Sequence, residues 1–209
     1  MNKAVLIAAC ALLAGCTRSA PVESAAGLAP DWRRVATPDD RARLREWRTA
    51  FVAGLAQART AGHGAEIVRE GALLEPDAGR TARPPAGDYR CRVIKLGAKG
   101  PGGLAYVSYP SFMCRIDDEG GVASFKKLTG SQRPVGVILG NEQRLVFLGT
   151  LVLGDEKLPL DYGRDRERDM IGAVEAVADG RWRLILPYPH YESLIDVIEL
   201  MPASGPSRS

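Results

Sequence analysis

The sequence predicts a mainly β domain with an N-terminal α-helix, in which an antiparallel meander of about eight strands forms a barrel-like sheet. Apolar and polar residues alternate with period two from Asp88 onward, as they do in half-buried strands. Glycine-rich turn signals such as "GAKGPGG" and "DDEGG" separate the alternating runs. No helical period interrupts this region, so we expect sequential strands to pair and the sheet to close on itself, which removes exposed edges. A strongly curved open sheet, closed by the N-terminal helix, is the alternative.

The first residues, "MNKAVLIAACALLAGCTRS", are typical of a bacterial secretory signal. The apolar run from Ala4 to Ala14 is too short to cross a bilayer core of about 30 Å as a helix. It leads into "LAGC", which resembles the lipobox of bacterial lipoproteins. We therefore expect residues 1–15 to be removed as a signal peptide and Cys16 to be lipidated. An ordinary secretory signal with a chance cysteine is the alternative.

The predicted anchor also predicts a location. Several acyl chains hold a protein firmly on a membrane without spanning it. Thr17 follows the cysteine, where an aspartate is typical of lipoproteins that stay in the inner membrane. We therefore expect a lipid-anchored protein of the cell envelope, on the periplasmic face of the outer membrane. Residues 16–31 are small, polar and proline-containing, which predicts a flexible tether.

A helical segment that packs on the sheet is predicted over residues 32–86. Thr37 can cap a helix that begins at Pro38 and ends at Gly62 or Gly64. "AEIVREGALL" predicts a short second helix, and "EPDAGRTARPPAG" predicts a loop. The apolar stripe of the first helix, which we expect to cover the body of its own domain, has helical spacing: Leu44, Trp47, Phe51, Leu55 and Ala58.

The sheet is predicted over residues 87–202 and is followed by a flexible tail over residues 203–209. The pair Asp179-Gly180, between two apolar runs, is a strong signal for a two-residue hairpin. The expected strands run over residues 88–96, 110–117, 121–128, 134–139, 143–153, 170–177, 181–187 and 194–201.

Two cysteines remain after Cys10 leaves with the signal peptide and Cys16 takes the lipid. Cys91 lies on the apolar face of "DYRCRV" and Cys114 on the apolar face of "SFMCRI". In an oxidising compartment, two remaining thiols form a disulfide more often than a metal site or a nucleophile. We therefore predict a Cys91–Cys114 disulfide that joins two strands from inside.

A small polar turn in "KKLTGSQRPVG" is a candidate ligand contact. Its hydroxyl groups, backbone amides and three cations could hold an anionic group at the mouth of a barrel. The alternative is a hairpin loop whose residues serve the turn itself. The three cations are Lys126, Lys127 and Arg133.

The stretch "PYPHYES" holds a histidine, a carboxylate and a hydroxyl, as hydrolase sites do. Residues three apart on an extended segment do not converge, there is no G-x-S-x-G elbow, and the only other histidine, His63, lies at the end of the predicted helix. Zinc would need three or four suitably spaced ligands. We therefore predict no catalytic residue, no metal and no cofactor here, and interpret the stretch as a loop with a candidate contact rim: Tyr188, His190 and Tyr191.

Three further features of the sequence carry charged or glycine-rich patterns, and none of them predicts a functional site by itself. Glu175 and Asp196 lie inside apolar strands, and the sequence does not decide whether they are buried carboxylates that need cationic partners or surface charges. "GAKGPGG" lacks the pattern of a phosphate loop, so we expect a connection between strands. "DYGRDRERD" lacks calcium spacing and interleaves arginines with its carboxylates, which predicts a self-neutralising surface segment.

The chain resembles a family of uncharacterised bacterial lipoproteins that is defined only as a domain of unknown function. The resemblance covers about Asp31 to Met201 and rests on "DWRRVATPDDRARLREWRTAF", "GDYRCRVIKLGAKG", "KLTGSQRPVG", "VFLGTLVLGDE" and "GRWRLILPYPHYESLIDVIEL". It implies no known activity. At the level of the fold alone, the meander with an internal cysteine pair is also similar to lipocalin-type barrels and to small periplasmic inhibitors of metalloproteases.

Composition narrows the classes of function. The net charge is only +3 and acidic residues are interspersed throughout, so we expect no nucleic-acid partner. We expect a non-catalytic module that binds a small molecule or lipid, with the membrane contacted through the lipid anchor. The alternative is a protein-interaction subunit of the envelope, such as an inhibitor or an assembly accessory. The third class of function is an enzyme, but the sequence contains no set of catalytic residues that would converge on one site.

Overall fold

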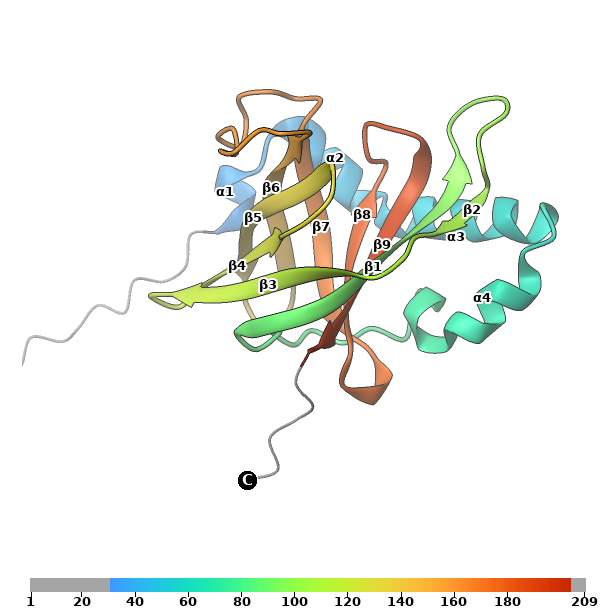
Figure 1. Cartoon of the computed structure of the whole chain (residues 1–209), viewed down its shortest axis with the longest axis horizontal. Helices are drawn as coiled ribbons and strands as arrows, with labels where there is room; N and C mark the ends of the chain where they lie inside the picture. The colour runs from blue at the N-terminus through green and yellow to red at the C-terminus, as the bar shows by residue number, and fades with distance from the viewer. Residues whose placement is uncertain (1–30, 204–209) are drawn as a thin grey trace, which may run out of the picture.

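A closed barrel of eight antiparallel strands forms the body of the protein, as predicted (Figure 1). The structure is a computed structural model that describes residues 31–203. The first strand, β1, pairs with β9 and so closes the barrel. The barrel strands are β1 (Gly87–Ala98), β3 (Phe112–Glu119), β4 (Val122–Lys127), β5 (Gln132–Gly140), β6 (Leu145–Leu153), β7 (Asp169–Ala176), β8 (Trp182–Pro187) and β9 (Ser193–Pro202).

An additional strand, β2 (Tyr106–Ser108), was not predicted. It pairs with the last part of β1, around Lys95, whereas β3 pairs with the first part, from Gly87 to Cys91. Only three residues are paired in β2, and a run this short carries almost no periodic signal.

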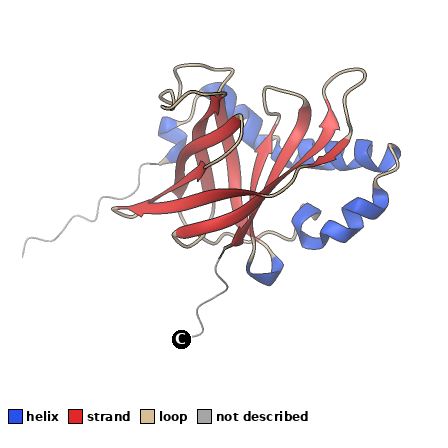
Figure 2. Cartoon of the chain, viewed as in Figure 1, coloured by secondary structure: helices blue, strands red, loops and turns tan. Residues whose placement is uncertain are grey.

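The helices precede the sheet and lie along one side of it (Figure 2). Thr37 Oγ1 accepts a hydrogen bond from the amide of Asp40 at 3.2 Å, which confirms the predicted cap. The predicted single amphipathic helix is divided at Glu46, where the backbone leaves helical geometry (φ −89°, ψ 10°). The elements are α1 (Trp32–Val35), α2 (Pro38–Arg45), α3 (Trp47–Thr60), α4 (Gly64–Glu70) and the 3₁₀ helix η1 (Gly71–Leu74).

The apolar stripe of α3 packs on the outer face of the sheet, as predicted. Phe51 and Ala58 are fully buried there, against outward-facing residues of β1 and β9 such as Leu96 and Ile195. Gly54 permits the close approach, because a Cβ at this position would lie 3.0 Å from the Leu96 carbonyl oxygen. The helices therefore cover one wall of the barrel and leave its interior to the strands.

The barrel interior contains a second core made by alternate residues of each strand. Cys91 and Cys114 both face inward and form the predicted disulfide, with their Cα atoms 6.0 Å apart. Phe125 and Phe147 meet edge to face at 5.8 Å. This inner core fills the end of the barrel nearest to the first residues of β1.

One end of the barrel is covered by the segment between η1 and β1. The Tyr89 hydroxyl donates a hydrogen bond to the Pro85 carbonyl at 2.6 Å, and Trp182 Nε1 donates to the Ala82 carbonyl at 3.1 Å. At the same end, β7 and β8 are joined through a short 3₁₀ turn, Ala178–Gly180, which contains the predicted Asp179-Gly180 signal. The opposite end carries the connections 99–105, 128–131, 154–168 and 188–192, and is called the open end below.

Tyr89 makes the stability of this covered end dependent on alkaline pH. Burial raises the pKa of Tyr89 to about 12 from an ordinary value of 10.0. The folded state therefore keeps a proton that the unfolded chain loses, so a stabilisation that is fully present below pH 10 is lost as the pH rises toward about 12. We expect Tyr89 to account for roughly 2–3 kcal/mol of that loss, since one pKa unit corresponds to about 1.36 kcal/mol.

Urea denaturation of the wild type and Tyr89→Phe, from neutral pH to about pH 12, measures this contribution. We expect the unfolding free energy of Tyr89→Phe to fall less steeply in the alkaline range. Equal slopes in the two proteins would contradict the assignment. Some slope remains in the variant, because burial also raises the pKa of Tyr106 to about 12.

Candidate functional site

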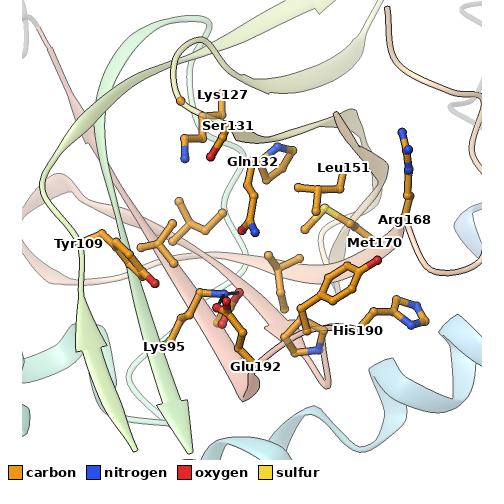
Figure 3. Close-up of a pocket in the computed structure, with 18 of the residues that line it drawn as sticks. Lys95, Tyr109, Lys127, Ser131, Gln132, Leu151, Arg168, Met170, His190 and Glu192 are labelled. Atoms are coloured by element: carbon orange, nitrogen blue, oxygen red, sulfur yellow. Dashed lines mark hydrogen bonds and ion pairs between the residues drawn. The ribbon is translucent and has the colours of Figure 1, made fainter. Parts of the chain in front are cut away.

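A cavity of about 420 Å³ lies inside the open end of the barrel (Figure 3). Its volume falls within the range of small-molecule pockets, about 300–1,000 Å³. It is lined by residues from α2, from the strands, from the segment 109–111 and from three of the connections at this end, 128–131, 154–168 and 188–192. The fold therefore brings segments that are distant in sequence to one concave site.

The inner wall of the cavity is apolar. It is formed where the inward-facing rows of the strands continue past the filled core toward the open end. Several of these side chains are only half-buried although they point into the barrel. The main apolar lining residues are Val93, Phe112, Leu151, Met170, Leu186 and Ile198.

A charged cluster lies on the β1 and β9 side of the cavity. Lys95 Nζ is 3.0 Å from Glu192 Oε2 and 3.3 Å from Asp196 Oδ2, and Ser193 Oγ donates a hydrogen bond to Asp196 Oδ1. Burial raises the pKa of Asp196. Burial by itself would lower the pKa of Lys95, but Asp196 and Glu192 raise it overall. The lysine is thus held as a cation whose charge is already neutralised.

The connection 188–192, which contains most of "PYPHYES", is held in place on several sides. Arg43 Nη1 donates to the Tyr188 carbonyl at 3.1 Å, and the Lys99 amide donates to the Glu192 carbonyl at 2.9 Å. Tyr188 (φ 45°) and Glu192 (φ 65°) both have positive φ, which is uncommon for residues other than glycine and persists where the surroundings fix it. The loop thus forms a fixed part of the cavity rim.

His190 lies at this rim, is exposed and lines the edge of the cavity (Figure 3). It forms no hydrogen bond or ion pair with any residue in the described range 31–203. Burial lowers its pKa, and the positive charges of Arg43 and Lys99 lower it further. The other histidine, His63, stacks on Tyr106 outside the cavity at 5.2 Å. The structure therefore does not place either histidine against a hydroxyl or a thiol.

The remaining rim residues of this loop point in different directions. Tyr191 lines the cavity and is 42% exposed. Tyr188 instead packs against the helix-side core.

The three cations around the 128–131 connection also point in different directions. Lys127 faces into the cavity, as its inward position on β4 requires. Lys126 points outward and pairs with Asp117 at 2.6 Å. Arg133 ties two connections together, because it donates to the carbonyls of Gly130, Gly154 and Glu156, each at 2.6 Å.

Lys95 and Arg43 are two charged residues among the lining residues that were missed at the sequence level. Lys95 continues the inward row of Tyr89, Cys91 and Val93, so the alternation around the cysteine could have revealed it. Arg43 reaches the cavity from α2, and no local pattern signals this contact.

The two acidic strand residues whose register was open are both paired. Asp196 faces the barrel interior and is 8% exposed, beside Lys95. Glu175 faces the helix layer, where Arg183 Nη2 lies 2.8 Å from its Oε2.

The acidic and basic segment 161–169 neutralises itself and its neighbours. Arg168 pairs with Glu156 at 2.7 Å and with Asp165 at 3.4 Å, and Arg166 pairs with Asp39 at 3.2 Å.

Within residues 31–203, no group of three or more histidine, cysteine or carboxylate side chains is placed to hold a metal ion. Among the helices of the same range, none combines the length and apolar character needed to cross a membrane. Cys16, the predicted lipidation site, lies outside the described residues, as do the predicted signal peptide and nearly all of the predicted tether and tail.

Comparison with known proteins adds a family but no activity. No curated protein and no solved structure matches the chain. A family described as a domain of unknown function (DUF4893) matches residues 32–200, which span the helices and nearly the entire barrel. The chain therefore belongs to the DUF4893 family.

Proposed function

We propose that this protein is a non-catalytic binding module that holds a small, largely apolar molecule in the open end of its barrel. The observation that carries the proposal is the cavity of about 420 Å³. A barrel of this strand number can be filled by its own side chains or can hold one small ligand. Here the inner core fills one end only, which leaves room at the other.

The character of the cavity wall supports an apolar ligand. Val93, Phe112 and Met170 point into the barrel yet remain half-buried. Covering such apolar surface releases it from water, which is favourable in proportion to the area removed. A bound apolar group would complete the burial that the strands leave unfinished.

The N-terminal sequence supports the location that we propose for this binding. "LAGC" at residues 13–16 fits a lipid anchor at Cys16, and Thr17 fits the outer membrane. The protein would then present its barrel to the periplasm from the membrane surface. A lipidic ligand suits this setting, because membranes are its source.

Binding of the neutral fluorescent probe N-phenylnaphthylamine tests the proposal. We expect the wild type to bind the probe and Met170→Trp, which fills the cavity, to weaken binding by about tenfold or more. Met113→Trp is the matched control, since Met113 lies on the outer face of β3 and is 39% exposed. Absence of binding to the wild type, or equal weakening by both variants, would contradict the proposal.

A protein partner is the second candidate, favoured by apolar side chains around the open end. Four exposed large apolar residues lie on the connections at this end: Leu104, Leu128, Leu158 and Tyr191. Tyr109, also exposed, lies between β2 and β3 and lines the cavity. Native mass spectrometry of the protein extracted from its own envelope separates the two functions. A bound small molecule supports the binding module, whereas a stable complex with another protein supports the interaction subunit.

A further inference from the structure

Of the four cations that line the cavity, three are paired with a carboxylate and one is not. Lys95 has two carboxylate partners, and Arg168 pairs with Glu156 at 2.7 Å. Arg43 pairs with Asp40. Lys127 has no carboxylate partner among the residues that the structure describes, and its Nζ lies over the ring of Phe112, 4.3 Å from the ring centroid.

The environment of Lys127 disfavours an isolated cation. Burial lowers its pKa, and the positive charges of Lys95 and Arg133 lower it further. A cation over an aromatic face gains only about 0.5–2 kcal/mol, depending on how far it is desolvated. An anion at this position would offset the desolvation and add a charge-assisted hydrogen bond.

Further polar groups converge on the same side of the cavity. Ser131 and Gln132 follow Lys127 in the adjoining connection and at the start of β5, and all three lie on one side in Figure 3, opposite Lys95 and Glu192. The side chains of Ser131, Gln132 and Thr129 line the cavity and form no hydrogen bond within the described chain. Their hydroxyl and amide groups are free to donate to a ligand.

We infer that the ligand is an amphiphile with a singly charged anionic head, such as a carboxylate, which binds Lys127 Nζ while its apolar part lies against Phe112, Leu151 and Met170. This inference rests on the proposed function and specifies its ligand class. A head group with one negative charge matches the cavity, because Lys127 is the one lining cation that has no carboxylate partner among the described residues. On the opposite side of the mouth, Glu192 and Asp196 share one lysine, so a polyanion would meet repulsion there.

Three ligands with the same apolar chain and different heads test the inference: decanoic acid, decanol and decylamine. Calorimetry near neutral pH should show that the wild type binds decanoate roughly tenfold to a hundredfold more tightly than decanol, which is the range expected for a charge-assisted hydrogen bond. Decylamine should bind more weakly than decanol, since its head carries the same sign as Lys127.

Lys127→Met and Lys126→Met provide the matched pair of variants. The two lysines are adjacent in sequence but lie on opposite faces of β4, one in the cavity and one paired with Asp117 outside. We expect Lys127→Met to lose the preference for decanoate over decanol while it still binds decanol. Lys126→Met should keep that preference. Retained decanol binding also shows that the variant is folded.

The outcomes distinguish this inference from the proposed function. Equal affinity of the wild type for decanoate and decanol, or an unchanged preference in Lys127→Met, would overturn the anionic head and leave the binding module intact. If the wild type binds neither decanoate nor decanol, and N-phenylnaphthylamine also fails to bind, the binding module itself is wrong and the inference falls with it.

Discussion

Arg183→Met is expected to lower the unfolding free energy by about 3–5 kcal/mol, the range found when one partner of a buried, charge-assisted network is removed. Arg183 is fully buried between β8 and the segment that follows α4. Urea denaturation of the two proteins measures the loss directly, as the difference in midpoint at equal slope.

The size of this effect follows from the groups that Arg183 satisfies. Its Nη1 donates to the carbonyls of Leu73 at 3.0 Å and Glu75 at 2.8 Å, and its Nη2 donates to the carbonyl of Pro76 at 3.0 Å. Nη2 also lies 2.8 Å from Glu175 Oε2. Methionine would fill part of the space but would leave the Leu73 and Pro76 carbonyls without this donor and the Glu175 carboxylate without its counter-charge, which costs the desolvation of each group.

Arg90→Met is the control, because Arg90 is an exposed arginine on a neighbouring part of the barrel. Its replacement should change the unfolding free energy by no more than about 0.5 kcal/mol. Hydrogen exchange should also show that Arg183→Met loses protection first in residues 71–76. A loss below about 1 kcal/mol, or a loss equal to that of Arg90→Met, would show that the network does not stabilise the fold.

Arg183 also illustrates what the sequence could reveal about the fold. The alternation in "GRWRLILP" correctly indicates a strand, with Trp182 and Leu184 on one face and Arg183 on the other. An arginine on the face opposite the core is normally solvated, but here the chain at residues 71–76 and the ring of Phe51 cover it. Period-two patterns therefore predicted the strands and the closed barrel, but not which outer positions the helical segment would cover.

The candidate site was predictable only where it continues a strand pattern. Lys127 and Asp196 belong to strands whose alternation was visible, yet the faces of those strands could not be assigned until the barrel closed. Arg43 and the positive φ of Tyr188 and Glu192 arise from contacts between segments more than a hundred residues apart or from local backbone geometry. Such features depend on the tertiary structure, so no local window of sequence contains them.

Removal of the disulfide is expected to destabilise the protein by about 3.4 kcal/mol in the chain-entropy account, in which the cost depends on the separation of 23 positions between Cys91 and Cys114 in the sequence. The measurement compares the wild type with a Cys91→Ala and Cys114→Ala double variant by urea denaturation, with and without reductant. Both proteins carry serine at positions 10 and 16, so that reductant acts on one disulfide only. Reductant should shift the wild type toward the double variant and leave the double variant unchanged; a wild type that does not respond would contradict the prediction.

Because of its position, the disulfide is also expected to affect ligand binding in the cavity. Cys91 pairs in register with Phe112, and Val93 is the next inward residue on β1, so the disulfide lies directly below two residues of the cavity wall. It also marks the point where β1 stops pairing with β3, because the following residues of β1 pair with β2 instead. Without the covalent link, this junction is held only by non-covalent interactions: hydrogen bonds, core packing and the Arg115–Asp88 ion pair. We therefore expect the double variant to bind N-phenylnaphthylamine more weakly than the wild type even under conditions in which both proteins are fully folded.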